Sequence, residues 1–401
     1  MPKPYHVVRR LAFVDWFAGV GGFRRGLELA GAECVGFCEF DKYAYCSYVA
    51  MHCMTEKERE SLKPLTLKAR QKEILSNDIY LHGEWFAKDV RAVEPYDVPD
   101  ADLWTFGFPC QDISIAGKQW GIVAEETRSG LFYEIARLLE GREEKDRPQW
   151  LLVENVKNIL NINGGRDFLD VLNTLASLGY DIEWNLHNSK NYGVPQNRER
   201  VYIVGHLRGR GRGKIFPLKR ADGENPCNLK ALNKQFQRLR LYDPPGIACT
   251  LLAESHALGG KTGLYRVQDC LSPDQNKKSQ KSVGVIDGQG RLTRGSKLTY
   301  IVPTLRCRNI PEVVDIDNNK QLSGGVSEMG VVQDARIRRL TPRECFRLQG
   351  WADEYFERAQ MVNSDAQLYK QAGNGVTVSV VQAIGERMDE KTVSRCKFFG
   401  R

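Results

Sequence analysis

The stretch that decides the fold is residues 101–112, which read Ala-Asp-Leu-Trp-Thr-Phe-Gly-Phe-Pro-Cys-Gln-Asp. Its apolar half predicts a short buried strand over 101–106. Cys110 follows the carboxyl end of that strand, where open α/β sheets bind their ligands. Pro109 fixes its own φ and makes the turn stiff, so we expect the thiol to project from it. Taken alone, Cys110 is equally compatible with a small buried side chain, because free cysteine is often buried.

A glycine-rich turn near the amino end predicts a nucleotide-type site. An apolar run over 11–16 is followed by Phe17-Ala18-Gly19-Val20-Gly21-Gly22-Phe23 and then by a helical pattern over 23–30. Strand, glycine loop and helix in this order are typical of such sites. Arg24 occupies the third glycine position of a dinucleotide fingerprint, which counts against a cofactor with a pyrophosphate. The glycines would instead let the backbone approach a bulky, less charged ligand.

Acidic residues follow two further predicted strands. The strand over 34–38 ends at Glu39, which can accept hydrogen bonds from both hydroxyls of a ribose. The alternative for Glu39 is a surface carboxylate near a helix start. The strand over 150–153 ends at Glu154, so two neighbouring strands would deliver a thiol and a carboxyl group to one crevice. Along the first of these strands Cys34 and Cys38 are separated by an even step, and we expect both to face one side of the sheet.

Long connections separate some of these elements. The polar segment 111–130 is too long for an ordinary connection and has the glycines of a functional lid. Residues 55–76 read as one or two surface helices, an insertion with no suggested chemistry. Thr341, with Pro342 and Glu344 after it, predicts a helix start. Asn374 is expected to open an apolar helix that runs to Met388.

The positive charge of the chain is concentrated in one segment. The net charge is +8, and residues 206–336 hold 22 Lys and Arg against 12 Asp and Glu. This segment is rich in Gly, Asn, Asp and Pro and has short β-type runs, so it predicts a second, irregular domain. Charge of this kind suggests contact with a polyanion, although a solvated basic surface is the alternative. Arg208 and Arg210 lie in its first, acid-free stretch.

Composition narrows the class of protein. With 401 residues, 42% hydrophobic and 27% charged, the chain can bury a full core and has the balance of a soluble globular protein. No apolar run approaches the length that spans a membrane, and the first residues lack the apolar core of a signal peptide. Eleven scattered cysteines without a Cys-x-x-Cys pair argue against disulfides and structural zinc. We therefore expect a reducing cytosol and no metal.

With the remaining motifs added, the chain resembles the DNA cytosine-5 methyltransferases of bacteria and phages. The resemblance covers nearly the whole length, and each of its motifs is weak alone but strong in this order. The segments that carry it are Phe17–Phe23, Pro109-Cys110-Gln111, Glu154-Asn155-Val156, Gln196-Asn197-Arg198-Glu199-Arg200, Arg339-Leu340-Thr341-Pro342-Arg343-Glu344 and Gly373-Asn374-Gly375-Val376. It implies an α/β fold: a doubly wound, Rossmann-like sheet that binds S-adenosylmethionine, in a catalytic domain of residues 1–205 and 337–401. Residues 206–336 would form a smaller, strand-poor target-recognition domain.

The resemblance also implies roles for individual residues. Cys110 would attack C6 of a cytosine flipped out of double-stranded DNA, Glu154 would bond its N3 and amino group, Arg200 would contact its O2 side, and Arg198 would favour the thiolate. S-adenosylmethionine would give its methyl group to C5 and leave as S-adenosylhomocysteine. The residues implied for its site are Phe17, Ala18, Gly19, Gly21, Gly22, Glu39, Asp89, Pro109, Asn374 and Val376. Those implied to contact DNA are Gln111, Ser114, Arg208, Arg210 and Thr250.

Other readings remain at this stage. The same machinery could methylate a structured RNA such as tRNA, although the large basic segment favours DNA. A non-enzymatic DNA-binding relative would lack the reactive residues, and Cys110, Glu154 and Arg198 are all present. A cysteine hydrolase would want a histidine partner, and none of the six histidines falls in a motif. The expected protein is a cytoplasmic monomer of a prokaryote or phage, in a restriction–modification setting that could include a separate endonuclease.

Overall fold

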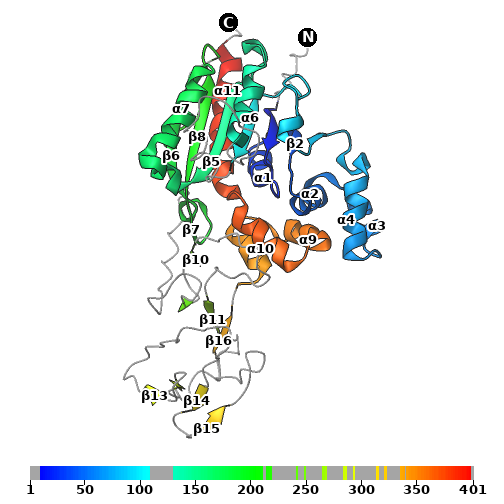
Figure 1. Ribbon diagram of the computed structural model, residues 1–401, viewed down its shortest axis with the longest axis vertical. Helices are drawn as coiled ribbons and strands as arrows, with labels where there is room; N and C mark the ends of the chain where they lie inside the picture. Colours follow the sequence, from blue (N-terminus) through cyan, green and yellow to red (C-terminus); the bar gives the residue numbers. More distant parts are fainter. Residues whose placement is uncertain are drawn as a thin grey trace, which may run out of the picture.

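The structure is a computed structural model, and it describes residues 10–108, 130–210, 214–218 and 340–398, with side chains up to Met388. Between 241 and 338 it describes only short strands. Figure 1 shows a sheet flanked by helices, with the orange helices α9 and α10 beside the blue N-terminal ones. Within the described parts, no helix is long and apolar enough to cross a membrane.

A seven-stranded sheet forms the centre of the body, in the order β3-β2-β1-β4-β5-β8-β6. The first five strands in this order are parallel, and β8 runs antiparallel to both of its neighbours. The order reverses between β1 and β4, which opens a crevice at their carboxyl ends. This confirms the predicted doubly wound sheet. The strands are β1 (Ala12–Trp16), β2 (Glu33–Cys38), β3 (Trp85–Ala87), β4 (Leu103–Gly107), β5 (Trp150–Val156), β6 (Tyr180–Asn188) and β8 (Glu199–Leu207).

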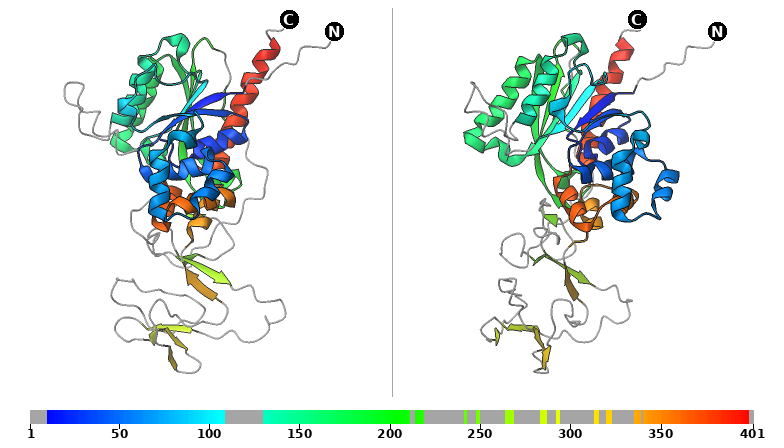
Figure 2. Two further views of the ribbon diagram at one scale, coloured as in Figure 1. Left: turned by 90° about the vertical axis from the view of Figure 1, so that its right-hand side faces the viewer. Right: turned by 45° about the vertical axis from the view of Figure 1, so that its right-hand side comes forward.

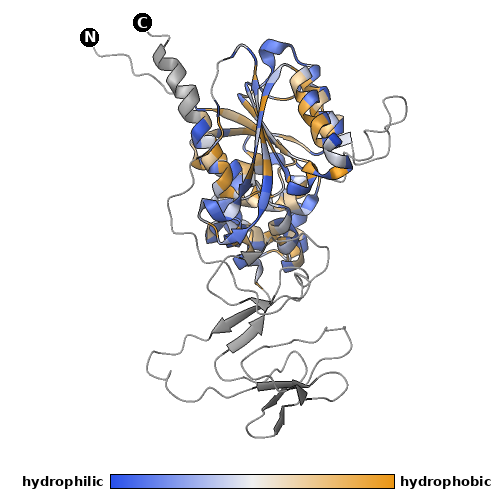
Figure 3. Cartoon of the chain, turned by 90° about the vertical axis from the view of Figure 1, so that its left-hand side faces the viewer, coloured by the Kyte–Doolittle hydropathy of each residue, from blue (hydrophilic) through white to orange (hydrophobic). Residues whose placement is uncertain are grey.

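Helices cover both faces of this sheet, so its central strands are apolar throughout. Leu151 and Val153 of β5 pack towards α6 (Leu131–Glu140) and α7 (Arg166–Ser177). Trp150 and Leu152 point the other way, towards α1 (Gly22–Leu29) and α11 (Val378–Phe398). The orange apolar colour on the strands and on the sheet-facing sides of these helices follows this arrangement in Figure 3. Burial on two faces explains why the strands read as continuous apolar runs rather than alternating ones.

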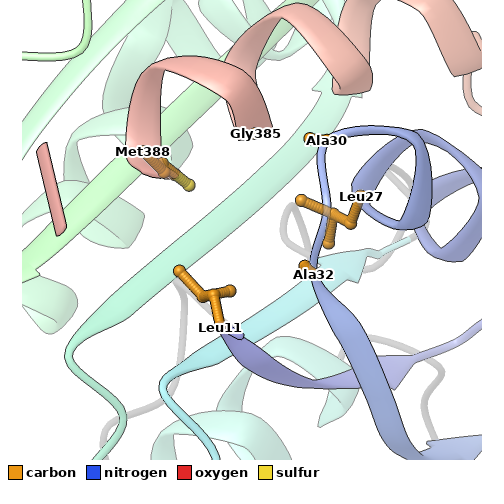
Figure 4. Close-up of a pocket in the computed structure, with 6 residues that line it drawn as sticks. All are labelled: Leu11, Leu27, Ala30, Ala32, Gly385 and Met388. Atoms are coloured by element: carbon orange, nitrogen blue, oxygen red, sulfur yellow. The ribbon is translucent and has the colours of Figure 1, made fainter. Parts of the chain in front are cut away.

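Helices α1 and α11 approach each other closely because glycines lie at their contact. A Cβ atom at Gly26 would come within 2.6 Å of Val381 Cβ, and one at Gly385 within 2.8 Å of Ala30 Cβ. A small apolar hollow remains beside this contact (Figure 4), lined by Leu11, Leu27, Ala30, Ala32, Gly385 and Met388. Helix α11 is therefore packed tightly into the body that the N-terminal strands and α1 form.

Replacing Gly26 with alanine is expected to destabilise the fold by about 1–3 kcal/mol, because the added methyl group would push α1 away from α11. The thermal unfolding midpoint of Gly26→Ala should fall by several degrees. Gly130 is the matched control, since nothing lies within 4 Å of a Cβ built there. An unfolding midpoint of Gly26→Ala equal to that of Gly130→Ala would contradict this packing.

A second group of helices lies beside the sheet and joins distant parts of the chain. Asn363 donates to the Tyr43 carbonyl and to Ser47 Oγ, both at 2.8 Å, and Lys370 Nζ lies 2.6 Å from Asp41 Oδ2. Both views in Figure 2 show these orange and blue helices together. The helices are α2 (Lys42–Tyr48), α3 (Glu56–Leu62), α4 (Leu67–Ser76), α8 (Pro342–Leu348), α9 (Asp353–Val362) and α10 (Asp365–Asn374).

The prediction of one or two helices over 55–76 is confirmed, because this segment forms α3 and α4. The segment also has a structural task, because Arg70 Nη1 and Gln71 Nε2 of α4 donate to the carbonyls of Met361 and Val362, at 2.9 and 2.7 Å. It therefore holds the end of α9 against the body.

Two helix starts were predicted near the carboxyl end, and the structure confirms one of them and contradicts the other. The helix start at Thr341 is confirmed, because its side chain and that of Glu344 form a capping box. The expectation that Asn374 opens a helix is wrong. Asn374 is the last residue of α10, and α11 begins only at Val378 after an extended break. Gly375 terminates α10 in an extended conformation, a stop that the apolar pattern alone did not predict.

A β-bulge also overturns the expectation for the two cysteines of β2. Phe13 pairs with Cys34 but Val14 pairs with Gly36, so one extra residue interrupts the register. The extra residue reverses the alternation of side chains. Cys34 therefore packs on the α1 face, whereas Cys38 packs on the opposite one.

The first described residues of the basic segment beyond Arg210 pack against the sheet. Ile215 and Phe216 are buried on the α11 face of the sheet, and their backbone N–H groups donate to the Glu183 carboxylate at 2.7 and 3.1 Å. Ile215 and Phe216 thus pack with the body around the sheet, and we propose that the second domain starts after residue 218. Beyond them the described strands are short, as the irregular texture predicts: β9 (Leu241–Tyr242), β10 (Ala248–Cys249), β11 (Leu264–Gln268), β12 (Val283–Ile286), β13 (Leu292–Thr293), β14 (Val313–Asp315), β15 (Lys320–Leu322) and β16 (Ala335–Arg338).

Short helical turns and one two-residue strand complete the body. The strand β7 (Gln196–Asn197) pairs in parallel with β10, which links the arginine motif to the second domain. The turns are η1 (Val49–Cys53), η2 (Asp78–Leu81), η3 (Val90–Ala92), η6 (Glu144–Asp146), η7 (Lys157–Leu160), η8 (Ile162–Gly165) and η9 (Ser189–Tyr192).

Candidate cofactor and catalytic site

The candidate residues gather at the carboxyl edge of the parallel strands. The glycine loop follows β1, Glu39 follows β2, Asp89 follows β3 and Glu154 lies near the end of β5. Because β8 is antiparallel, its first residues, including Arg200, lie at the same edge. The crevice expected from the sheet topology is therefore lined by residues of five strands.

The glycine loop turns tightly through backbone conformations that favour glycine. Gly19 and Gly21 have φ of 58° and 81°, and Gly21 N donates to the Ala18 carbonyl at 2.8 Å. Phe17 has a φ of 54°, a strained value for an aromatic residue. A Cβ at Gly22 would lie 2.8 Å from the Val376 carbonyl oxygen. The structure thus brings Val376 against the loop, while Asn374 is exposed at the end of α10.

Arg24 explains why the loop departs from a dinucleotide fingerprint. Its guanidinium is buried and points away from the loop, with Nη1 2.7 Å from Glu84 and Nε 2.7 Å from Glu28. The positive charge of Arg24 is therefore paired with carboxylates inside the body.

Glu39 is held in place by the backbone of its own site. Its two carboxylate oxygens accept hydrogen bonds from the N–H groups of Gly19 and Asp41, at 2.7 and 2.6 Å. Burial raises the pKa of Glu39 to about 7, although these two hydrogen bonds act in the opposite direction. Each carboxylate oxygen retains a second lone pair, which suits a ribose diol.

Phe40 is a residue that the sequence reading missed. It directly follows Glu39, and 64% of it is exposed although it is a large aromatic. A planar apolar face beside a ribose-binding acid is suited to a purine ring. The available signal was an aromatic residue directly after the acid at a strand end.

Asp89 lies at the same edge but is engaged locally. It caps the short turn η3 by accepting from Arg91 N, and its side chain pairs with Arg91 Nη2 at 2.6 Å. The Arg91 side chain lowers the pKa of Asp89. The turn-cap alternative thus describes its present contacts, and its contact with a cofactor stays a prediction.

Glu154 and Arg200 form an ion pair at the centre of the edge. Arg200 Nε lies 3.0 Å from Glu154 Oε1, and about 12–13% of each side chain is exposed. Gly107 of β4 is opposite Glu154 in the sheet register, and a Cβ there would be 3.4 Å from Glu154 Oε2. The absence of a side chain at 107 leaves the carboxyl group accessible from the end of β4.

Arg198 joins the arginine motif to the returning chain. Its Nη2 donates to the carbonyls of Gly373 and Gly375, at 3.2 and 2.8 Å. Burial and the neighbouring Arg200 lower the pKa of Arg198 to about 9, so it stays charged at neutral pH. It thereby places a cation beside the ion pair.

The residues around the thiol lie outside the described part of the chain. These are Pro109, Cys110, Gln111 and Ser114, together with Thr250 and the rest of segment 111–129. The last described residue before them is Phe108, whose carbonyl accepts a hydrogen bond from Asn155 Nδ2 at 2.9 Å. Asn155 therefore fixes the end of β4 relative to Glu154, a role that the sequence reading did not give it.

Arg208 and Arg210 are not brought to this site. Arg208 bonds Asp181 Oδ1 and the Ala176 and Tyr180 carbonyls, and Arg210 bonds carbonyls of residues 144–147. These contacts lie at the amino ends of β5 and β6, opposite the crevice. The two arginines therefore fasten the amino ends of these strands, and their contact with DNA stays a prediction.

The sequence matches the family model for C-5 cytosine-specific DNA methylases over residues 11–390. It is 30% identical to the type II methyltransferase M.HpaII of Haemophilus parainfluenzae, over 95% of this chain and 90% of that protein. Identity to the type II methyltransferase M.HhaI of Haemophilus parahaemolyticus is also 30%, over 93% of both chains. The chain belongs to the C-5 cytosine-specific DNA methylase family.

Solved structures support the fold. The S. pombe Dnmt2 methyltransferase superposes with a TM-score of 0.54 over 96% of this chain and 99% of that one, at 15% identity. A putative DNA modification methyltransferase from an E. coli prophage has a TM-score of 0.51. The protein is thus a DNA cytosine-5 methyltransferase with a Rossmann-like fold, and its family uses S-adenosylmethionine as methyl donor. Among the described residues, no cluster of three His, Cys, Asp or Glu side chains could hold a metal ion.

Proposed function

We propose that this enzyme methylates C5 of a cytosine flipped out of duplex DNA, in one recognised sequence, through a covalent bond between Cys110 Sγ and C6. The observation that carries the proposal is the Glu154–Arg200 pair, 3.0 Å apart beside the end of β4. Cys110 is two residues beyond Phe108, and two residues of chain span at most about 7 Å. The thiol and the ion pair are therefore within reach of one base.

The glycine loop and Glu39 fit S-adenosylmethionine. When bound, this cofactor supplies an electrophilic methyl group on a sulfonium. Glu39 would accept hydrogen bonds from its ribose hydroxyls, Phe40 would cover its purine, and the close approach of Gly22 and Val376 would shape the wall behind it. The side chains present match the donors and the apolar face of this ligand.

Glu154 and Arg200 would bind the cytosine ring. Arg200 fixes the orientation of the carboxyl group. In its protonated form Glu154 would donate to N3 and accept from the exocyclic amino group of the base. A hydrogen bond at N3 draws electron density from the ring as sulfur adds. Remaining donors of Arg200 would contact O2.

Cys110 would then act as nucleophile. Its thiolate forms the S–C6 bond, and the electron pair of the C5–C6 double bond makes C5 nucleophilic. That electron pair then forms the new bond from C5 to the methyl group. Loss of the C5 proton leaves the C5–H bond pair to re-form the C5–C6 double bond, and the S–C6 bond breaks with its electron pair returning to Cys110 Sγ. The charge of Arg198 supports the thiolate, whose pKa in a free thiol is about 8.5.

Sequencing of bisulfite-treated DNA, after incubation with the protein and S-adenosylmethionine, tests the function. Methylated cytosines confined to one short duplex sequence are expected. Single-stranded DNA and structured RNA serve as parallel substrates. Methylation of RNA alone, or unmethylated DNA with a protein that binds the cofactor, would contradict the proposal. Bisulfite sequencing of DNA from the cells that make this protein would give the methylated sequence that a cognate endonuclease, the possible partner, would have to recognise.

The basic segment is proposed to hold the sequence specificity. Exchanging residues 219–336 for the matching segment of a relative with another target is expected to move the methylated sequence with the segment, because base contacts specify and phosphate contacts only position. Bisulfite sequencing of both proteins provides the measurement. An active hybrid that still methylates the original sequence would place recognition elsewhere.

The pH dependence of cofactor binding follows from Glu39. Its pKa is about 7 in the fold and 4.5 ordinarily, so its contribution to stability is present below pH 4.5 and is lost as the pH rises through 7. A ribose diol donates to the ionised form, so cofactor affinity should rise between pH 6 and 8. Calorimetry should show this rise in the wild type and a flatter profile in Glu39→Gln. An identical pH profile for both proteins would contradict the role of Glu39.

A further inference from the structure

A π-helical turn lies directly under the glycine loop. The turn η1 continues α2, and Met54 N bonds the Val49 carbonyl at 3.0 Å, one residue farther back than in an α-helix. Such turns expose carbonyl groups and are frequent at functional sites. Here Arg59 of α3 donates to the Ala50 carbonyl at 3.1 Å, and Arg358 of α9 donates to the Met51 carbonyl at 3.1 Å. Arginines from the next helix, α3, and from the distant helix α9 thus hold the turn in shape.

The turn presents the ring of His52 to the loop. His52 Nε2 lies 3.0 Å from the Val20 carbonyl oxygen. A carbonyl oxygen only accepts, so Nε2 carries the proton. The ring packs against Tyr48, Tyr355 and Trp351, with centroid distances of 4.9, 5.5 and 5.9 Å. Burial, together with the nearby Arg24, lowers the pKa of His52 well below its usual range, so the ring is neutral.

The contact between ring and loop is direct. Gly21 has a φ of 81°, and a Cβ built there would overlap His52 Nε2 and come within 3.1 Å of Tyr48. The loop therefore rests on His52 and Tyr48, with no space for a side chain between them. Gly21 N at the same time donates to Ala18, which closes the loop from its other side.

We propose that His52 is a positioning residue for the cofactor, because its Nε2–H holds the Val20 carbonyl and so fixes the backbone of residues 20–22. This inference rests on the proposed function of the loop as the S-adenosylmethionine site. It adds a residue 30 positions away from the loop, on an element without a recognised motif. The π-helical turn is the device that brings that residue there.

Two variants separate the hydrogen bond from the packing of the ring. His52→Phe keeps an aromatic ring between Tyr48 and Tyr355 but removes the donor. His52→Gln keeps an N–H donor at a similar distance from the backbone. His206→Phe is the matched control, because that histidine also packs on an aromatic ring, Trp150, but at the opposite edge of the sheet.

Calorimetry with S-adenosylmethionine and full-length protein is the test, with unfolding midpoints recorded in parallel. His52→Phe is expected to weaken binding about five- to tenfold, the effect of one lost hydrogen bond, and His52→Gln to restore most of it. The KM for the cofactor should rise in His52→Phe while kcat at saturation stays near that of the wild type. His206→Phe should bind the cofactor as the wild type does.

The result that overturns the inference is cofactor affinity in His52→Phe equal to that of the wild type, or affinity lost equally in the Phe and Gln variants. If His52→Phe does not fold, Arg358→Gln is the second test, because it removes the Arg358 donor to the Met51 carbonyl that holds the same turn. Arg358→Gln should raise the cofactor KM several-fold, and an unchanged KM in it would equally contradict the inference. Failure of the wild type to bind S-adenosylmethionine would instead refute the proposed function of the loop.

Discussion

Replacing Cys110 with alanine is expected to lower methyl transfer by at least about 10⁴-fold, because the variant lacks the sulfur atom proposed to form the bond to C6. Incorporation of labelled methyl groups into DNA measures the rate. Cofactor affinity and the unfolding midpoint should stay near their wild-type values, since the variant removes only the sulfur atom. Methyl transfer by Cys110→Ala at the wild-type rate would end the covalent mechanism.

A covalent species can be sought independently of the rate. Duplex DNA with 5-fluorocytosine at the methylated position should stay attached to the wild type, because fluorine cannot leave C5 as the proton does. Cys110→Ala should form no such complex under the same conditions. A stable complex that forms equally with the alanine variant would point to another nucleophile.

The second large effect is expected at Glu154. Glu154→Gln retains the size of the side chain but loses the ion pair with Arg200 and the acid–base capacity at N3, so kcat should fall about 10²–10⁴-fold. Cofactor affinity should be unchanged, because Glu39 lies on a different strand. Single-turnover methylation at saturating DNA separates this loss from weaker DNA binding.

Glu199→Gln is the control for that experiment. Glu199 lies one residue before Arg200 and pairs with Lys157 at 2.9 Å, but the pair is exposed. Exposed pairs contribute little, so the control should keep nearly full activity. If Glu154→Gln were as active as Glu199→Gln, the catalytic role of Glu154 would be wrong.

Much of the fold could be predicted from local sequence. The strands around Trp104 and Trp150 and the glycine loop were predictable, because apolar runs and glycine turns are local patterns. The capping box at Thr341 was equally local. The bulge in β2 was not, because an extra residue in the register depends on the neighbouring strand. For the same reason the end of α10 at Asn374 escaped prediction, since a preference for helix did not reveal where tertiary contacts stop it.

The candidate site, like the fold, was only partly predictable from local sequence. Glu154 and Arg200 belong to different motifs, and their contact follows once β5 and β8 are neighbours. The hydrogen bonds of Arg208 and Arg210 to backbone carbonyls could not be predicted, because the positive charge of a segment does not reveal which carbonyls its arginines bond. His52 was missed, and Asn155 was quoted in a motif without its role, because a single hydrogen bond to a carbonyl has no sequence pattern.

The position of α11 in the chain determines when, during synthesis, the fold can be completed. During synthesis, the face of the sheet with Phe13, Leu103 and Leu152 has no cover until the ribosome has delivered Val381 and Ile384. A nascent chain that stops after the basic segment therefore carries a bare apolar face and an open glycine loop. Such a chain would be a substrate for chaperones rather than a methyltransferase. We therefore expect an active enzyme only from a chain synthesised at least as far as Ile384, and a product truncated before α11 should not methylate DNA.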